Sequence, residues 1–191
     1  MNCFTLNSES FSLLASVKWR FLATFLIASA LLAACSPTFN WRAASLDIEA
    51  STLAAMLPCK PDQAVRSVVL GTNTLSLHML GCEAGGATFT VAGAQVAEPA
   101  LLSPTLAAWQ SAMAVQLKAS APGALERLAL PGAIAVAGSG RQSLAGAAAN
   151  AQVAWFARGL TLYQAAIYTQ DVNTKLPADA VDSFFEGLRL P

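Results

Sequence analysis

The strongest secondary-structure pattern of this chain runs through residues 64–91, which read AVRSVVLGTNTLSLHMLGCEAGGATFTV. β-Branched residues fill its first part, which ends at the turn sequence of residues 71–73. Apolar and polar side chains then alternate in residues 75–80, and again in residues 88–91 after the Gly-Gly pair at 85–86. Alternation with a period of two is typical of strands, and glycine pairs are typical of the turns between them. This stretch therefore predicts a meander of three antiparallel strands.

Two segments change from strand to helix periodicity. Within residues 104–118, an apolar stripe recurs at helical spacing, and Ser103 before Pro104 is the expected N-cap. The stripe consists of Leu106, Trp109, Met113 and Leu117. Residues 177–188 predict a final helix, whose apolar face consists of Val181, Phe184, Phe185 and Leu188. We expect Trp109, Phe184 and Phe185 to pack in the core.

The rest of the body adds strands and loops. Strand signals return at residues 153–157 and 160–168, which Arg158 and Gly159 join. Residues 41–57 mix turn signals with strand or helix signals, and residues 131–140 are rich in loop residues. With neither an internal repeat nor a low-complexity linker, residues 45–191 predict one domain. Its expected class is α+β, with a central antiparallel sheet covered by at least two helices.

The N-terminal segment is organised as an export leader. Lys18 and Arg20 precede residues 21–34, which carry no charge. A basic region, an apolar run of this length and small residues before a cut are typical of signal peptides. The run ends in Leu32-Ala33-Ala34-Cys35, which resembles the lipobox of bacterial lipoproteins at all four positions. We expect cleavage between Ala34 and Cys35, which removes residues 1–34.

A membrane-spanning helix is the rival interpretation, but it needs roughly 20 apolar residues and the run here is shorter. In lipoproteins the cysteine at this position receives lipid on its sulfur and on its new α-amine. The resemblance therefore implies that lipid on Cys35 anchors the protein to a membrane, with residues 35–44 as a tether. Ser36, which stands where an Asp retains many lipoproteins in the inner membrane, favours the outer membrane, facing the periplasm. The long segment before Lys18 leaves open a translation start at Met1 or at Val17.

Composition excludes several classes of partner. Without Lys18, Arg20 and Glu9, the mature chain has nine basic and ten acidic residues. This balance lacks the basic patch of nucleic-acid-binding proteins and the polybasic patch of peripheral membrane proteins. Once the leader is removed and Cys35 carries lipid, Cys59 and Cys82 remain as a pair in an oxidising compartment, and they predict a disulfide. Two free thiols or a redox-active pair are the alternatives.

Candidate catalytic groups are sparse. His78 is the only histidine, and no Cys/His set of three or four metal ligands is visible, so we expect neither a metal nor another cofactor. We interpret His78 as a solvated or hydrogen-bonded side chain on the polar face of a strand. Residues 138–141, Gly-Ser-Gly-Arg, lack the ending of a phosphate-binding loop and predict a flexible loop. The acidic residues give no reason to pair as catalytic carboxylates; those considered are Asp47, Glu49, Asp62 and Glu83.

Aromatic residues are the other candidates for a binding site, because Trp and Tyr are enriched at interfaces. A ligand groove could be lined by members of one aromatic set: Trp41, Trp109, Trp155, Phe156, Tyr163 and Tyr168. Trp41 and Arg42 follow the tether and form a candidate interface with a partner protein.

The body also resembles PsbP-like α/β/α sandwich domains over roughly residues 55–191. The resemblance is carried by the Pro58-to-Pro61 break, a pair of hairpins, a long helix with a tryptophan and the Leu-Pro-Gly step at 130–132. The strand at 159–164 and the helix ending in Phe-Phe-Glu-Gly-Leu at 184–188 complete it. Such domains are often exported or lipid-anchored and bind partners without catalysis, and no functional residues carry over. The cysteine pair departs from that pattern.

Together these observations predict a lipid-anchored envelope lipoprotein that is not an enzyme and that binds a partner protein or supports envelope assembly. Two alternatives stay open. One is an envelope enzyme acting on peptidoglycan, lipid or a thiol substrate, through Cys59, Cys82 or His78. The other is a small-ligand-binding lipoprotein whose groove is lined by Trp109 or Trp155.

Overall fold

A computed structural model of the protein describes residues 38–171 and 174–191, with only the backbone described in residues 120–122. The predicted leader, the cleavage site at Ala34 and the lipidation site at Cys35 lie outside the described residues. Residues Thr38–Pro191 form one compact unit. The predicted tether of residues 35–44 therefore overlaps this unit, because β1 (Arg42–Ile48) already begins at Arg42. In the described part of the chain, no helix is long and apolar enough to span a membrane.

The unit is built on a seven-stranded antiparallel sheet whose strand order is β3-β4-β5-β9-β8-β7-β6. Its strands are β3 (Asp62–Leu70), β4 (Asn73–Ala84), β5 (Ala87–Gln95), β6 (Ala119–Pro122), β7 (Gly140–Gly146), β8 (Asn150–Arg158) and β9 (Thr161–Thr169). A separate two-stranded sheet pairs β1 with β2 (Ser51–Leu57). The expected meander is confirmed as β3-β4-β5, and the expected hairpin after it as β8-β9.

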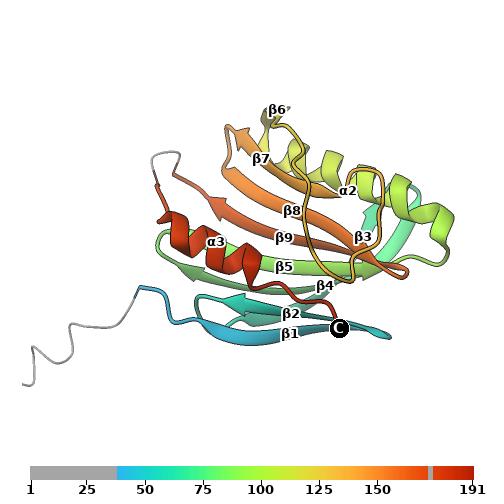
Figure 1. Ribbon diagram of the computed structural model, residues 1–191. Coiled ribbons are helices and arrows are strands. Elements are labelled where there is room, and N and C mark those ends of the chain that lie inside the picture. The colour runs from blue at the N-terminus through green and yellow to red at the C-terminus, as the bar shows by residue number, and fades with distance from the viewer. Residues whose placement is uncertain (1–37, 172–173) are drawn as a thin grey trace, which may run out of the picture. The chain divides into compact units, whose positions relative to one another are not determined.

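Helices lie on both faces of this sheet (Figure 1). On one face, α2 (Leu102–Leu117) buries the predicted stripe, including Trp109, against β5, β8 and β9. On the other face, α3 (Ala178–Glu186) packs together with β1 and β2. The predicted antiparallel sheet with helices packed on it is thus confirmed, in a fold that is mostly sheet. The two-stranded sheet that shares the second face was not predicted.

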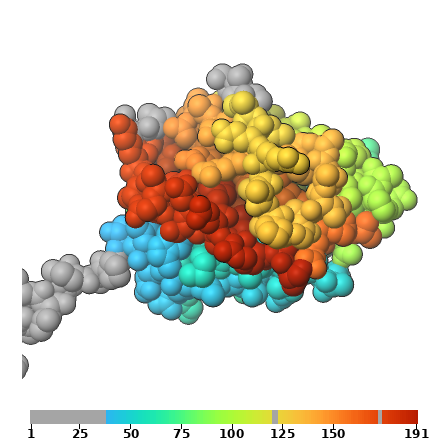
Figure 2. Space-filling view, viewed as in Figure 1, coloured from blue at the N-terminus to red at the C-terminus, as the bar shows by residue number. Residues whose placement is uncertain are grey.

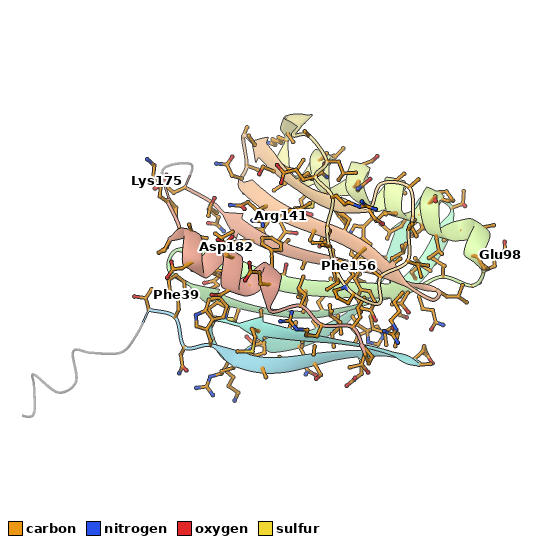
Figure 3. The ribbon with its side chains drawn as sticks, viewed as in Figure 1. Phe39, Glu98, Arg141, Phe156, Lys175 and Asp182 are labelled. Atoms are coloured by element: carbon orange, nitrogen blue, oxygen red, sulfur yellow. A yellow bond between two sulfur atoms is a disulfide. The ribbon has the colours of Figure 1, made fainter. Side chains whose placement is uncertain are left out.

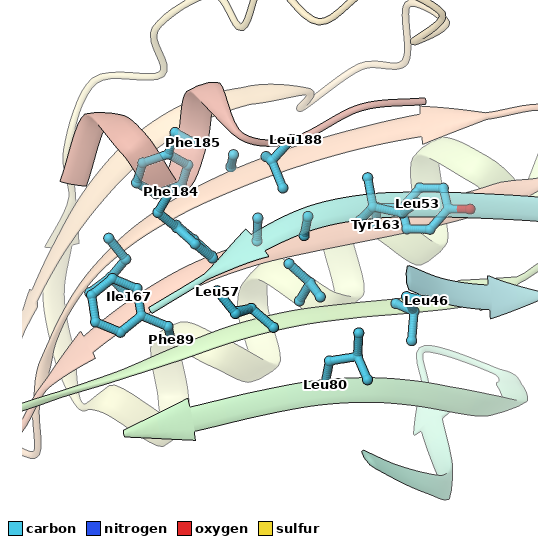
Figure 4. Packing of buried hydrophobic residues seen from close by; sticks show 14 of the residues in the cluster. Leu46, Leu53, Leu57, Leu80, Phe89, Tyr163, Ile167, Phe184, Phe185 and Leu188 are labelled. Carbon is cyan, nitrogen blue, oxygen red and sulfur yellow. The ribbon is translucent and has the colours of Figure 1, made fainter. Parts of the chain in front are cut away.

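The second face holds the larger cluster of aromatic side chains (Figure 4). Phe184 packs edge-on against Phe89 at 5.4 Å between ring centroids, and against Phe185 at 5.0 Å. The loop between β6 and β7 borders α3 on this face (Figure 2), where Leu128, Leu130 and Ala133 pack against the cluster. Phe184 and Phe185 are buried as the sequence predicts.

Residues of β5 alternate between the two faces because neighbouring side chains of a strand point in opposite directions. Phe89 and Val91 pack in the cluster beneath β1 and β2, whereas Ala92 packs in the cluster beneath α2. Gly93 lies where the two-stranded sheet approaches most closely. A Cβ atom there would lie 2.4 Å from Cδ1 of Ile48 and 2.8 Å from Cδ1 of Tyr163.

Two local predictions are wrong. The long helix begins earlier than expected: a 3-10 turn, η1 (Pro99–Leu101), leads into it, and Leu101 is its N-cap. Proline fixes a backbone angle suited to the start of a helix, so Pro99 sets the beginning and Ser103 is an exposed residue inside the helix. The expected flexible loop at residues 138–141 is only half a loop, because Gly140 and Arg141 open β7.

Candidate functional site

The main candidate site is a groove of about 1050 Å³ between α2 and the α2-facing side of the sheet. The helix is fixed at both of its ends. Near its start, the Nδ2 group of Asn73 donates to the hydroxyl of Thr105 at 3.3 Å. At its other end, the carbonyl of Leu117 lies so close to Gly146 that a Cβ atom there would be 2.1 Å away. The helix therefore crosses from the β3-β4 turn to β7, and the groove lies beside its C-terminal half.

The floor of the groove is mainly apolar. Strands β3, β4 and β5 contribute Val68, Leu77, Met79 and Ala92 to it. The wall contributed by α2 consists of Trp109, Ala112, Met113, Gln116 and Leu117, and Ala148 and Ala149 add a further edge. Among the described residues that line the groove, Asp62 carries the only formal charge, and its side chain is exposed. The groove therefore suits an uncharged or apolar ligand.

A few polar side chains lie among these apolar ones. Tyr168 hydrogen-bonds to the side chain of Thr90. Burial raises the pKa of Tyr168 to about 12, although the bond to Thr90 opposes this shift. Its hydroxyl is therefore protonated and neutral at physiological pH. Gln164, only 6% exposed, donates from Nε2 to Sδ of Met113 at 3.1 Å. These groups can orient a ligand through hydrogen bonds without attracting charge.

The structure distributes the predicted aromatic set over both faces of the sheet. Trp109 and Tyr168 line the groove. Trp155 is fully buried behind Trp109, with ring centroids 5.6 Å apart, and its Nε1 has no hydrogen-bond partner. Phe156 and Tyr163 stack at 5.3 Å in the opposite cluster. The six aromatic residues therefore do not line a single groove.

Trp41 packs at the edge of the cluster beneath β1 and β2. Its ring stacks on Phe39 at 6.2 Å and meets the edge of Phe89 at 6.4 Å. Arg42 is exposed at the start of β1. Trp41 is half-buried rather than free, so its ring has a packing role as well, and the partner interface at these two residues stays a prediction.

The cysteine pair forms the predicted disulfide. Cys59 and Cys82 are bonded at 2.05 Å, with Cα atoms 5.9 Å apart. The bond ties the segment after β2 to β4, and Cys82 packs against the cluster of the second face. The sulfur atoms thus lie away from the groove beneath α2.

His78 borders a small hollow of about 110 Å³ beside Asp47. Asp47 accepts a hydrogen bond from Thr52 at 2.8 Å. The other acidic candidates are dispersed: Glu49 begins the turn after β1, Glu83 is exposed on β4, and Asp62 borders the groove. Within residues 38–171 and 174–191, no group of three or more His, Cys, Asp or Glu side chains could hold a metal ion.

Residues of the Gly-Ser-Gly-Arg segment at 138–141 bind to other parts of the folded unit. Gln110 of α2 donates to the carbonyl of Gly138 at 2.9 Å. Arg141 donates from Nη2 to Gln152 at 2.9 Å, and its guanidinium lies 4.1 Å from the ring centroid of Phe185 (Figure 3). This arginine helps to fasten β7 to β8 and to α3, and it does not reach the groove lining.

Sequence reasoning found Trp109 but missed the floor of the groove. One signal was present: Gln164 interrupts an otherwise apolar strand, and a polar side chain at a buried position needs a local partner. The local spacing of residues in the sequence does not predict where α2 crosses the sheet, and this course leaves part of the groove floor uncovered.

Comparison of the chain with models of protein families, with curated proteins and with solved structures finds no match.

Proposed function

We propose that this chain is an exported lipoprotein, held to a bacterial envelope membrane by lipid on Cys35, whose folded unit binds a small apolar ligand without catalysis. The observation that carries this proposal is the groove beneath α2. Its volume of about 1050 Å³ lies just above the range of roughly 300–1,000 Å³ that is typical of small-molecule sites. Its lining of apolar residues with a few hydrogen-bonding groups is also typical of such sites.

The chemistry of the lining favours binding over catalysis. A nucleophile needs an adjacent base, and a general acid or base needs a pKa near the working pH. In the described lining, the Tyr168 hydroxyl has a pKa of about 12, far from neutrality. The hydroxyl of Thr90, its hydrogen-bond partner, donates to the carbonyl of Ala166 at 3.4 Å. These groups are arranged to hold a neutral ligand.

A fluorescence titration tests the proposal. The apolar dye N-phenylnaphthylamine should bind the mature lipoprotein in detergent, and binding should weaken at least about tenfold in Ala112→Glu, because a carboxylate in an apolar groove is costly to desolvate. Ala107→Glu is the matched control, since Ala107 is exposed on the same helix but does not line the groove. Equal dye binding in the two variants would contradict the proposal.

A second candidate function, the binding of a partner protein, is favoured by β3. This strand is at one edge of the sheet, and Val65 and Val69 on it are 61% and 69% exposed. An unpaired edge with apolar side chains can accept an extended segment of another protein as a further strand. Crosslinking in envelopes tests this candidate. Val65→Lys with Val69→Lys should abolish a crosslinked product, whereas Val115→Lys, at an exposed valine of α2, should keep it.

A further inference from the structure

We infer that the groove holds an acyl chain of a phospholipid drawn from the bilayer to which the protein is anchored, and that the polar end of the groove faces that bilayer. This inference rests on the proposed function and names the class of its ligand. It is carried by the distribution of polar groups along the groove and by the place where the chain enters the folded unit.

The groove is amphipathic along its length. Leu77 and Val68 line one end, and Thr88, Tyr168 and Gln170 line the other. From Leu77 to Gly81, also in the floor, β4 advances about 14 Å at roughly 3.4 Å per residue. An apolar stretch of this length with hydrogen-bonding groups at one end matches an acyl chain followed by the ester of a lipid. A compact hydrocarbon would leave the polar end unused.

The walls fit a flexible chain. Met79 on the floor and Met113 on α2 face the groove, and unbranched thioether side chains adapt to irregular apolar ligands. The side-chain amide of Gln170 can donate to an ester carbonyl, whereas an anionic site would need a cation, which the described lining lacks. A neutral ester therefore fits the polar end better than a free carboxylate.

The polar end lies at the same end of the sheet as the beginning of the folded unit. Thr88 follows the β4-β5 turn by two residues, and the ring of Phe39 packs against that turn at Gly85 (Figure 3). Thr38, the first described residue, stands three positions after Cys35, and a fully extended chain spans at most about 11 Å over three positions. Lipid on Cys35 therefore brings the bilayer close to this end of the sheet.

Tryptophan quenching tests the inference. The mature lipoprotein is reconstituted in phosphatidylcholine vesicles whose acyl chains carry bromine, which quenches tryptophan at short range. Trp109 lines the groove, so we expect quenching in the wild type and in Ala107→Glu. Quenching should fall at least about twofold in Ala112→Glu, because the added carboxylate opposes an acyl chain in the groove. Gln116→Glu is a second variant, because it introduces the charge at another exposed position of the same wall, one turn of α2 from Ala112.

The outcomes separate this inference from the proposed function. Dye binding that depends on Ala112, without quenching that depends on it, would overturn the lipid inference and leave the ligand-binding function standing. If neither dye binding nor quenching changes in Ala112→Glu, both the proposed function and the lipid inference are overturned. A further arm presents brominated fatty acid in unbrominated vesicles: quenching in this arm alone would contradict a phospholipid source.

Discussion

At the scale of single residues, Gly93 decides how closely the two-stranded sheet can approach β5. A Cβ atom at this position would overlap Ile48 and Tyr163, both fully or almost fully buried. We expect Gly93→Ala to lower the free energy of unfolding by about 1–3 kcal/mol, the usual cost of an overfilled core. Denaturant titration measures this change.

Gly81→Ala is the control, because it adds the same methyl group to the neighbouring strand. Its Cβ would lie 3.2 Å from Cγ2 of Thr90, on the groove side, where the neighbouring side chain can shift. A loss of stability as large as that of Gly93→Ala would contradict the close approach inferred at Gly93.

Tyr168 makes stability depend on pH in the alkaline range. Its pKa is raised to about 12 from an ordinary value of 10.0, so the unfolded chain loses this proton first. The contribution of the neutral Tyr168 hydroxyl to the free energy of unfolding is complete below pH 10, and it is lost as the pH rises through about 12. We expect Tyr168→Phe to lose less stability than the wild type across this interval, measured by unfolding at a series of pH values. Tyr163, whose pKa burial also raises, remains in the variant as an internal comparison.

At the scale of elements, the disulfide fastens the second layer to the central sheet. Replacing both cysteines, Cys59→Ser with Cys82→Ser, frees the segment after β2 from β4. We expect a loss of about 3 kcal/mol in the free energy of unfolding, from the restored freedom of the unfolded loop. Reduction of the wild type should give the same stability as the double variant. Unchanged stability would contradict the structural role and favour the redox alternative.

The elements that could be predicted are those with a strong local period. Leu75, Leu77 and Met79 alternate regularly, and they lie together on the α2-facing side of β4, as the pattern indicates. In β1, only Leu46 and Ile48 are buried, which is too short a pattern to separate a strand from a helix. In β7, Leu144 is the only large apolar side chain, so periodicity gave no signal there. Two features decide these strands: hairpin pairing, of β1 with β2 and of β7 with β8, and the packing of Leu46, Ile48 and Leu144 in the two hydrophobic clusters.

The groove could be predicted only in part for a related reason. Trp109 was a candidate because of its residue type, but its exposure to a cavity depends on where α2 crosses the sheet. That course is fixed by contacts distant in sequence, such as Asn73 with Thr105 and Leu117 with Gly146. Local spacing places residues on a helix face, whereas the uncovered part of the floor follows from tertiary packing.

At the scale of the whole molecule, the link to the membrane depends on Cys35 in our proposal. Cys35→Ser removes the thiol that takes the lipid, so we expect the variant to leave the membrane fraction while its folded unit keeps its thermal stability. Fractionation of envelopes with a melting curve measures both. Mass spectrometry of the wild type provides the control, because it should show lipid on Cys35 and no residues 1–34. A variant that stays with the membranes would contradict anchoring through Cys35.

The alternation along β5 has an evolutionary consequence. Thr88, Thr90 and Ala92 contact the groove, while Phe89 and Val91 between them hold the opposite layer. If the groove binds a ligand as we propose, the residues that select the ligand and those that hold the scaffold together alternate along this one strand. Selection can exchange the first set for a new ligand while the second set preserves the architecture, which makes this strand a natural place for functional divergence.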